Sequence, residues 1–155
     1  MSQVATLTIP SVTAQEELVQ TAVQGLPKEP SKIVRIYLVD DSKDFLIAAD
    51  RLLSANPRFR IVGSANSGHI ALEQISYLKP DLVIMDLVLP AMDGIQAIRL
   101  LKSQGSNTRV VLTSLEDGAE YHMSAEEAGA EGYLAKSEFG KEVTPFIEQL
   151  FGVAG

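Results

Sequence analysis

Short apolar runs alternate with helical patterns from Ile33 to the end of the chain. Each run has the length of a single strand, and the runs occupy 32–40, 59–65, 81–86, 109–114 and 132–136. The third run, DLVIMD, is apolar without interruption, which is typical of a strand covered on both faces. The pattern therefore predicts five strands.

Helical periodicity fills the segments between and after these runs, and we expect helices over 42–57, 67–79, 93–103, 118–130 and 137–151. Ser42 is placed to cap the first helix, and Asp93 with Gln96 predicts a capping box for the third. Pro145 indicates that the last helix either kinks there or begins there, with Thr144 as its cap. The apolar face of the first helix holds Phe45, Ala49, Leu52 and Leu53.

This alternation predicts an α/β fold. Parallel strands need crossover connections, so we expect one parallel sheet with helices on both faces. Right-handed crossovers leave few topologies, and the strand order 2-1-3-4-5 is one of them. Ligands of such sheets bind beyond the carboxyl ends of the strands, here near the switch point between strands one and three.

The first 32 residues differ from the rest of the chain. They are rich in Thr, Val, Gln and Pro and close with LPKEPSK, a composition typical of a linker. Thr13 and Glu16 have capping-box spacing, and Gly25 is placed to end a helix. We therefore expect an N-terminal extension over 1–32 with a short helix over 14–24, followed by a single domain over 33–152.

Carboxylates stand where two of the predicted strands end. The first strand ends in Asp40 and Asp41, and the third ends in Asp86. In the predicted order they meet at one rim, where each pair repels by about 1–4 kcal/mol. Mg²⁺ takes oxygen ligands and is usually held by one or two carboxylates plus a phosphate. The sequence therefore predicts a Mg²⁺ pocket that receives a phosphoryl group.

Hydroxyl groups and a cation are expected at the same rim. Thr113 and Ser114 end the fourth strand, and Lys136 follows the fifth. A carboxylate can act as a nucleophile and form an acyl phosphate, and Asp86 lies between the acidic side and the Thr/Lys side. Phosphoryl transfer needs mainly positioning and charge neutralisation, which this set supplies.

Composition excludes several other classes of function. The 155-residue chain has no cysteine, which excludes disulfides, thiolate metal sites and a cysteine nucleophile and fits a cytoplasmic protein. A net charge of -7 argues against nucleic acid or an anionic membrane as the main partner. The chain has no apolar run long enough to cross a bilayer, and its first residues lack the pattern of a signal peptide.

The segments LVDDS, KPDLVIMDLVLPAMDGI, VVLTS and AGAEGYLAK follow one another in this order. Over roughly residues 33–151 the chain resembles the receiver domain of two-component response regulators, which implies a flavodoxin-like receiver fold. The resemblance implies that Asp86 accepts a phosphoryl group from a sensor histidine kinase or a histidine phosphotransfer protein. It also implies Asp41 as a direct Mg²⁺ ligand, Asp40 as a ligand through water, and the Val88 carbonyl as a further ligand.

The resemblance extends to the residues that would respond to the phosphoryl group. Thr113 resembles the switch hydroxyl, Tyr133 the coupled aromatic side chain, and Lys136 the cation that pairs with the phosphate. The expected phosphate-binding residues are Thr113, Ser114 and Lys136. Many receivers have proline after this lysine, whereas Ser137 stands here, so the rigidity of the lysine loop is open. A downstream target is expected at the face formed by 118–130, 132–136 and 137–151, and a homodimer is a further candidate assembly.

Simpler interpretations exist for each of these residues. Asp40 and Asp41 could form a solvated turn, Thr113 could be an ordinary strand residue, and Tyr133 could pack in the core. His69 and His122 are expected on helix surfaces without a role in phosphotransfer.

Three functions compete at this point. The first is a phosphorylation-controlled signalling module that is not itself an enzyme, apart from slow self-dephosphorylation. The second is a receiver that docks on partners without phosphorylation. The third is a Mg²⁺-dependent phosphatase with an aspartate nucleophile, but its acid/base position two residues later is Val88, which transfers no proton. Direct DNA binding is not expected, because the sequence has neither a helix-turn-helix pattern nor a basic patch.

Overall fold

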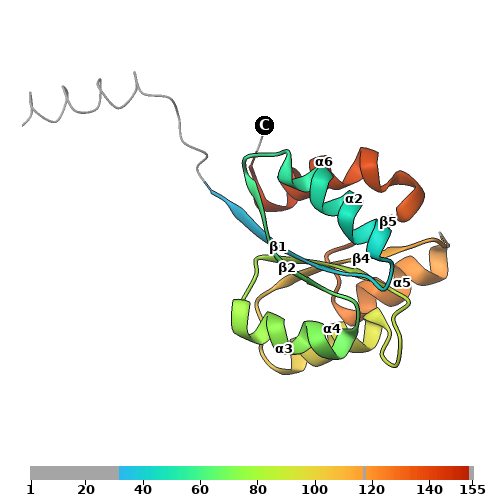
Figure 1. Cartoon of the computed structure of the whole chain (residues 1–155). Helices are drawn as coiled ribbons and strands as arrows, with labels where there is room; N and C mark the ends of the chain where they lie inside the picture. The colour runs from blue at the N-terminus through green and yellow to red at the C-terminus, as the bar shows by residue number, and fades with distance from the viewer. Residues whose placement is uncertain (1–31, 117, 154–155) are drawn as a thin grey trace, which may run out of the picture. The chain divides into compact units, whose positions relative to one another are not determined.

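The computed structural model describes residues 32–116 and 118–153, and they contain one five-stranded parallel sheet (Figure 1). The strand order is β2-β1-β3-β4-β5, as the sequence predicts. The strands are β1 (Val34–Val39), β2 (Phe59–Ala65), β3 (Leu82–Asp86), β4 (Arg109–Ser114) and β5 (Gly132–Ala135). All described pairings are parallel, because a helix connects each strand to the next.

Helices cover both faces of the sheet (Figure 1). One face carries α2 (Lys43–Ser54) and α6 (Phe139–Phe151), which pack on β1 and β3 through a first apolar cluster. The other face carries α3 (Gly68–Leu78), α4 (Gly94–Ser103) and α5 (Ala119–Ala128) over a second cluster. All five residues of β3 are buried, as expected for a strand with a core on each side.

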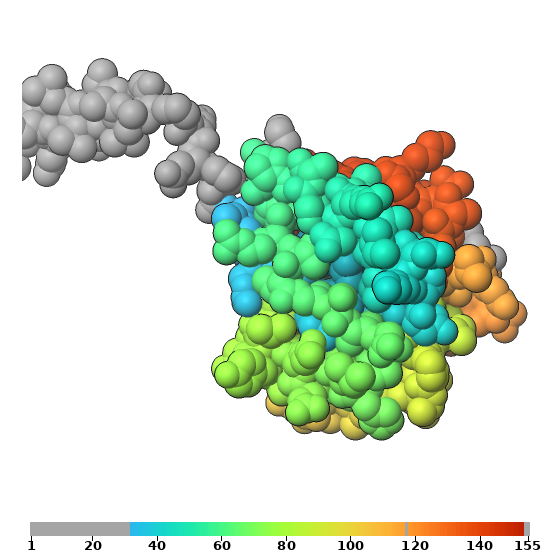
Figure 2. Space-filling view, viewed as in Figure 1, coloured from blue at the N-terminus to red at the C-terminus, as the bar shows by residue number. Residues whose placement is uncertain are grey.

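The edge strand β2 lies between α2 and α3 in the face seen in Figure 2, where these segments leave β1 only partly visible. Within α2, Ala49 and Leu53 are buried as their spacing predicts, whereas Leu52 is 37% exposed. The apolar face that α2 turns to the core is therefore narrower than the face predicted from the sequence, because it leaves out Leu52.

The helix N-termini follow the capping signals. The Ser42 hydroxyl accepts a hydrogen bond from the Phe45 N–H at the start of α2. Asp93 and Gln96 form the predicted capping box of α4. The cap of α2 closes the short loop after β1 that carries Asp40 and Asp41, and the cap of α4 closes the loop that follows Asp86.

The last helix begins before Pro145, which decides between the two expectations for it. Residues Lys136–Glu138 form a 3-10 helix, η1, and α6 starts at Phe139, so a start at Pro145 is wrong. Phe139, Val143 and Ile147 lie one helical turn apart and are buried against the sheet. Burial of this stripe outweighs the backbone hydrogen bond that Pro145 cannot donate.

The expected N-terminal extension and the expected helix within it are not tested by the structure. The extension over 1–32 and its helix over 14–24 lie outside the described residues apart from Lys32, and the domain boundary stays a prediction. Within the described ranges, none of the helices combines the length and the apolar character that crossing a bilayer demands.

Candidate functional site

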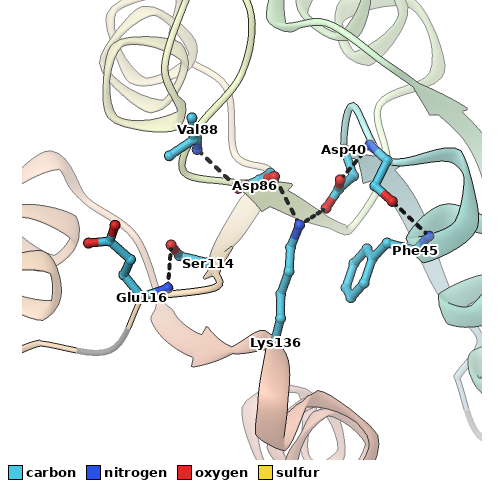
Figure 3. Close-up of polar contacts among 8 residues, drawn as sticks. Asp40, Phe45, Asp86, Val88, Ser114, Glu116 and Lys136 are labelled. Atoms are coloured by element: carbon cyan, nitrogen blue, oxygen red, sulfur yellow. Dashed lines mark hydrogen bonds and ion pairs between the residues drawn. The ribbon is translucent and has the colours of Figure 1, made fainter.

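The predicted site residues lie at the carboxyl edge of the sheet (Figure 3). Asp40 follows β1 directly, Asp86 is the last residue of β3, and Lys136 opens η1 directly after β5. Strands β1 and β3 are hydrogen-bonded neighbours, with Val39 opposite Met85. The parallel register therefore brings Asp40 and Asp86 to the same rim from positions 46 residues apart in the sequence.

Lys136 bridges the two carboxylates. Its ammonium nitrogen lies 2.7 Å from Asp40 Oδ2 and 3.0 Å from Asp86 Oδ2. The lysine side chain is only 11% exposed, and the aspartates are 1% and 8% exposed. An ion pair with so little solvent around it is screened weakly, so both contacts hold the ammonium in place.

Backbone N–H groups hold the other oxygen of each carboxylate. Asp40 Oδ1 accepts from the Ser42 N–H at 2.8 Å, and Asp86 Oδ1 accepts from the Val88 N–H at 3.0 Å. Figure 3 shows the Asp86 side chain between the Val88 N–H and the Lys136 ammonium. Each carboxylate thus has a fixed orientation before any ligand arrives.

Asp41 completes an acidic cluster. Asp40, Asp41 and Asp86 each offer a carboxylate oxygen, and these oxygens all lie within 4.8 Å of one another. Lys136 neutralises one of the three charges, so the cluster keeps an excess of negative charge. Several carboxylate oxygens with uncompensated charge suit a hard divalent cation such as Mg²⁺.

Burial and neighbouring groups shift the proton affinities of this cluster. Burial raises the pKa of Asp86 above its usual range, although the Val88 N–H and Lys136 pull it down; the charge of Asp40 raises it further. Burial alone would lower the pKa of Lys136, but the hydrogen bonds and charges of Asp40 and Asp86 outweigh it, and the net shift is upward. Lys136 is therefore protonated, and it lies beside Asp86, whose charged form is disfavoured by burial.

Thr113 stands beside Asp86 in the sheet. The two residues are opposite each other in the β3–β4 register, and Thr113 is 0% exposed. Its hydroxyl has no hydrogen-bond partner among the residues that the structure describes. A buried hydroxyl without a partner is costly, and it marks a donor that a ligand at the rim could use.

Ser114 and Tyr133 do not join the contacts around Asp86. The Ser114 hydroxyl accepts from the Glu116 N–H at 3.1 Å, so it holds the loop after β4. The Tyr133 hydroxyl donates to the Glu116 carbonyl, and its ring lies 4.4 Å from the ring of His122. Both residues therefore contact the loop after β4.

One member of the site was not predicted. The Phe45 ring lies beneath the Lys136 ammonium, with 4.6 Å between the nitrogen and the ring centroid. The sequence placed Phe45 on the apolar face of a helix and gave no signal for contact with a lysine 91 residues away. Both expected surface histidines, His69 and His122, are exposed.

Comparison with known proteins now adds to this geometry. The model of the response regulator receiver domain family matches residues 36–146. The structure is similar to the signal receiver domain of the response regulator NarL from Mycobacterium tuberculosis (TM-score 0.74, 31% identity, 79% of this chain and 99% of that one). It is also similar to the response regulator domain of Thermotoga maritima CheB (TM-score 0.72, 28% identity, 80% and 100%).

Curated relatives correct one expectation. A protein-glutamate methylesterase/protein-glutamine glutaminase from Nocardioides sp. is 38% identical over 119 residues, covering 76% of this chain and 32% of that protein. A protein of the same name from Pseudomonas putida is 38% identical over 105 residues, covering 67% and 28%. The chain thus spans about a third of the length of these relatives. The expectation that the chain is not itself an enzyme, apart from slow self-dephosphorylation, is wrong on this comparison, because these relatives are enzymes by name.

Proposed function

The chain belongs to the response regulator receiver domain family, and from this membership we propose that Asp86 accepts the phosphoryl group. The observation that carries the proposal is the Lys136 ammonium, 3.0 Å from Asp86 Oδ2 at the rim of the sheet. This contact places a positive charge directly beside the carboxylate that is the proposed nucleophile. A receiver of this family works with a histidine kinase or phosphotransfer protein and with a downstream effector.

In the proposed reaction an oxygen of Asp86 forms a bond to phosphorus while the phosphorus–nitrogen bond of a phosphohistidine breaks. The imidazole nitrogen keeps the electron pair of the broken bond and takes up a proton, and no atom changes oxidation state. The Val88 N–H orients the carboxylate, and Lys136 compensates the charge of the phosphoryl oxygens. This division of labour fits a transfer that needs positioning more than covalent chemistry.

We propose that Asp40, Asp41, Asp86 and the Val88 carbonyl hold Mg²⁺. The support is the cluster of carboxylate oxygens within 4.8 Å of one another and their excess of negative charge. Bound Mg²⁺ supplies charge neutralisation for the phosphoryl oxygens and for the clustered carboxylates.

The cytoplasm is the proposed compartment, supported by the absence of cysteine.

Phosphorylation is proposed to change the contacts of Thr113 and Tyr133. A phosphoryl group adds roughly 1.5–2 negative charges and new acceptors. The buried Thr113 hydroxyl would gain its missing partner there, with Ser114 moving as its neighbour. Tyr133 holds the Glu116 carbonyl in the same loop, so a shift of that loop would reach α5, β5 and α6, the proposed partner face.

The test is the intact mass of the protein after incubation with acetyl phosphate, with and without Mg²⁺. We expect one phosphoryl adduct that needs Mg²⁺, is absent in Asp86→Asn, and persists in the matched control Asp50→Asn on the exposed side of α2. An adduct of equal yield in Asp86→Asn would refute the assignment of the acceptor.

A second candidate comes from the curated relatives: a receiver that controls a protein-glutamate methylesterase. The 38% identity over 119 residues favours it. The measurement is the release of methanol from a protein carrying glutamate methyl esters by a protein-glutamate methylesterase mixed with this protein, with and without the phosphodonor. Release that rises with phosphorylation supports this candidate, and release that is the same in both states argues against it.

A further inference from the structure

We propose that Phe45 is a positioning residue for Lys136. Its aromatic face holds the ammonium beside Asp86 through a cation–π contact. The inference rests on the proposed phosphotransfer to Asp86 and deepens it, because it identifies what keeps the cation in place when its carboxylate partners make other contacts.

The geometry of the contact is favourable. The ammonium nitrogen lies 4.6 Å from the ring centroid, inside the range of about 6 Å within which such contacts act. The lysine side chain is 11% exposed, so little water competes with the ring. Figure 3 shows the ring directly beside the lysine side chain, on the side of Asp40.

A second aromatic ring holds the Phe45 ring in place. Phe139 packs edge-on against it, with ring centroids 5.0 Å apart and an angle of 64° between the planes. Phe139 directly follows the short helix η1 that Lys136 opens. This aromatic pair therefore ties the lysine loop to the first turn of α2.

A closed circuit of contacts runs through the same residues. The Ser42 N–H donates to Asp40 Oδ1, and the Ser42 hydroxyl accepts from the Phe45 N–H. The Phe45 ring faces Lys136, which pairs with Asp40 Oδ2 at 2.7 Å. The positions of ring, ammonium and carboxylate are therefore set together by the start of α2.

The ring differs from the carboxylates in one respect that matters for function. Asp40 and Asp86 are proposed ligands of other groups, and each can leave the ammonium. The ring has no other charged partner within the described contacts and attracts the ammonium whichever carboxylate it pairs with. Ser137 also lacks the fixed φ angle that a proline would give the backbone after Lys136, so side-chain packing has to fix this loop.

The test compares Phe45→Leu and Phe45→Tyr in the rate of phosphorylation by acetyl phosphate with Mg²⁺. We expect roughly a fivefold lower rate for Phe45→Leu, and a rate within about twofold of native for Phe45→Tyr, which keeps the aromatic face. The matched control is Phe151→Leu, because Phe151 makes the same kind of contact with Arg109 at 4.9 Å, at the far end of α6. We expect this control to leave the rate unchanged.

A second readout needs no phosphodonor. The ring current of Phe45 should shift the terminal methylene protons of Lys136 upfield in the NMR spectrum, in the native protein and in Phe45→Tyr but not in Phe45→Leu. If the native protein takes no phosphoryl group, the proposed acceptor role fails while this shift still tests the contact.

Fluorinated phenylalanines at position 45 separate electrostatics from packing, because fluorine weakens the negative face of the ring and keeps its shape. We expect the rate to fall stepwise with the number of fluorines while the melting temperature stays near native. This series also covers the case in which Phe45→Leu fails to fold. A rate that is constant across the series, or a native rate in folded Phe45→Leu, would overturn the proposal.

Discussion

Among the described residues, Lys136 is the only cation that pairs with Asp40 and Asp86. Asp40 is almost fully buried, and the Lys136 ammonium 2.7 Å away offsets the cost of burying a carboxylate there. The residue that would pair with a phosphoryl group therefore also stabilises the clustered carboxylates of the rim.

Replacing this cation should lower stability. We expect Lys136→Met to reduce the free energy of unfolding by about 1–3 kcal/mol without divalent cations, since it leaves buried carboxylates without a counter-ion. Mg²⁺ should restore part of the loss, because it binds the folded state alone. Urea denaturation with and without Mg²⁺ measures both effects.

The control for this variant is Lys102→Met, which breaks the exposed pair with Glu131 at 3.9 Å. It should cost at most about 1 kcal/mol, with no response to Mg²⁺. Equal losses in the two variants would contradict the role given to Lys136.

The raised pKa of Asp86 has a consequence for stability against pH. A carboxyl group whose pKa is higher in the folded state contributes stability below its unfolded pKa, and the contribution is lost as the pH rises through the folded pKa. We therefore expect Asp86→Asn to be more stable than the native protein at neutral pH, with a gain that vanishes below about pH 4.

Urea midpoints of the two proteins across this range, without divalent cations, measure the difference, and Asp50→Asn serves as the exposed control. A gain of equal size at every pH would show that ionisation of Asp86 is not its cause.

At the scale of elements, the packing of α4 against β3 positions the end of that strand. A Cβ atom on Gly94, the first residue of α4, would lie 2.8 Å from the Asp86 carbonyl oxygen and 2.8 Å from Leu112 Cδ2. Only glycine therefore lets the helix start this close to the residue that carries the proposed acceptor.

We expect Gly94→Ala to lower the free energy of unfolding by about 1–3 kcal/mol, because backbone and a core side chain must move. The control Gly140→Ala, in the first turn of α6 with nothing within 4 Å, should be neutral or stabilising by up to about 1 kcal/mol. Thermal melting distinguishes the two, and a Gly94→Ala protein as stable as the control would contradict the close-packing argument.

The elements themselves were largely predictable from the sequence. Strand order follows from five apolar runs joined by helices, since crossover handedness leaves few arrangements. The start of α6 was predictable only as one of two alternatives, because the local rule for Pro145 competes with the burial of Phe139, Val143 and Ile147. A buried stripe outweighs one lost backbone hydrogen bond, and its burial depends on contacts that sequence spacing alone cannot rank.

At the scale of the whole molecule, the sheet brings together residues that are remote in sequence. The convergence of Asp40, Asp86 and Lys136 was predictable, because parallel strands place their carboxyl ends at one edge. The contact of Phe45 with Lys136 was not predictable, because it depends on the side-chain directions of two elements that are far apart in the sequence. The sequence alone thus predicts which charged residues meet at the strand ends, whereas the contact between an aromatic ring and one of these charges is found only in the structure.

The most direct test of the central claim is the location of the phosphoryl group. After incubation with acetyl phosphate and Mg²⁺, borohydride would reduce an aspartyl phosphate to homoserine, and peptide mass spectrometry would find the modified position. We predict homoserine at position 86 and at no other aspartate. Homoserine at Asp40 or Asp41 with Asp86 intact would contradict the account.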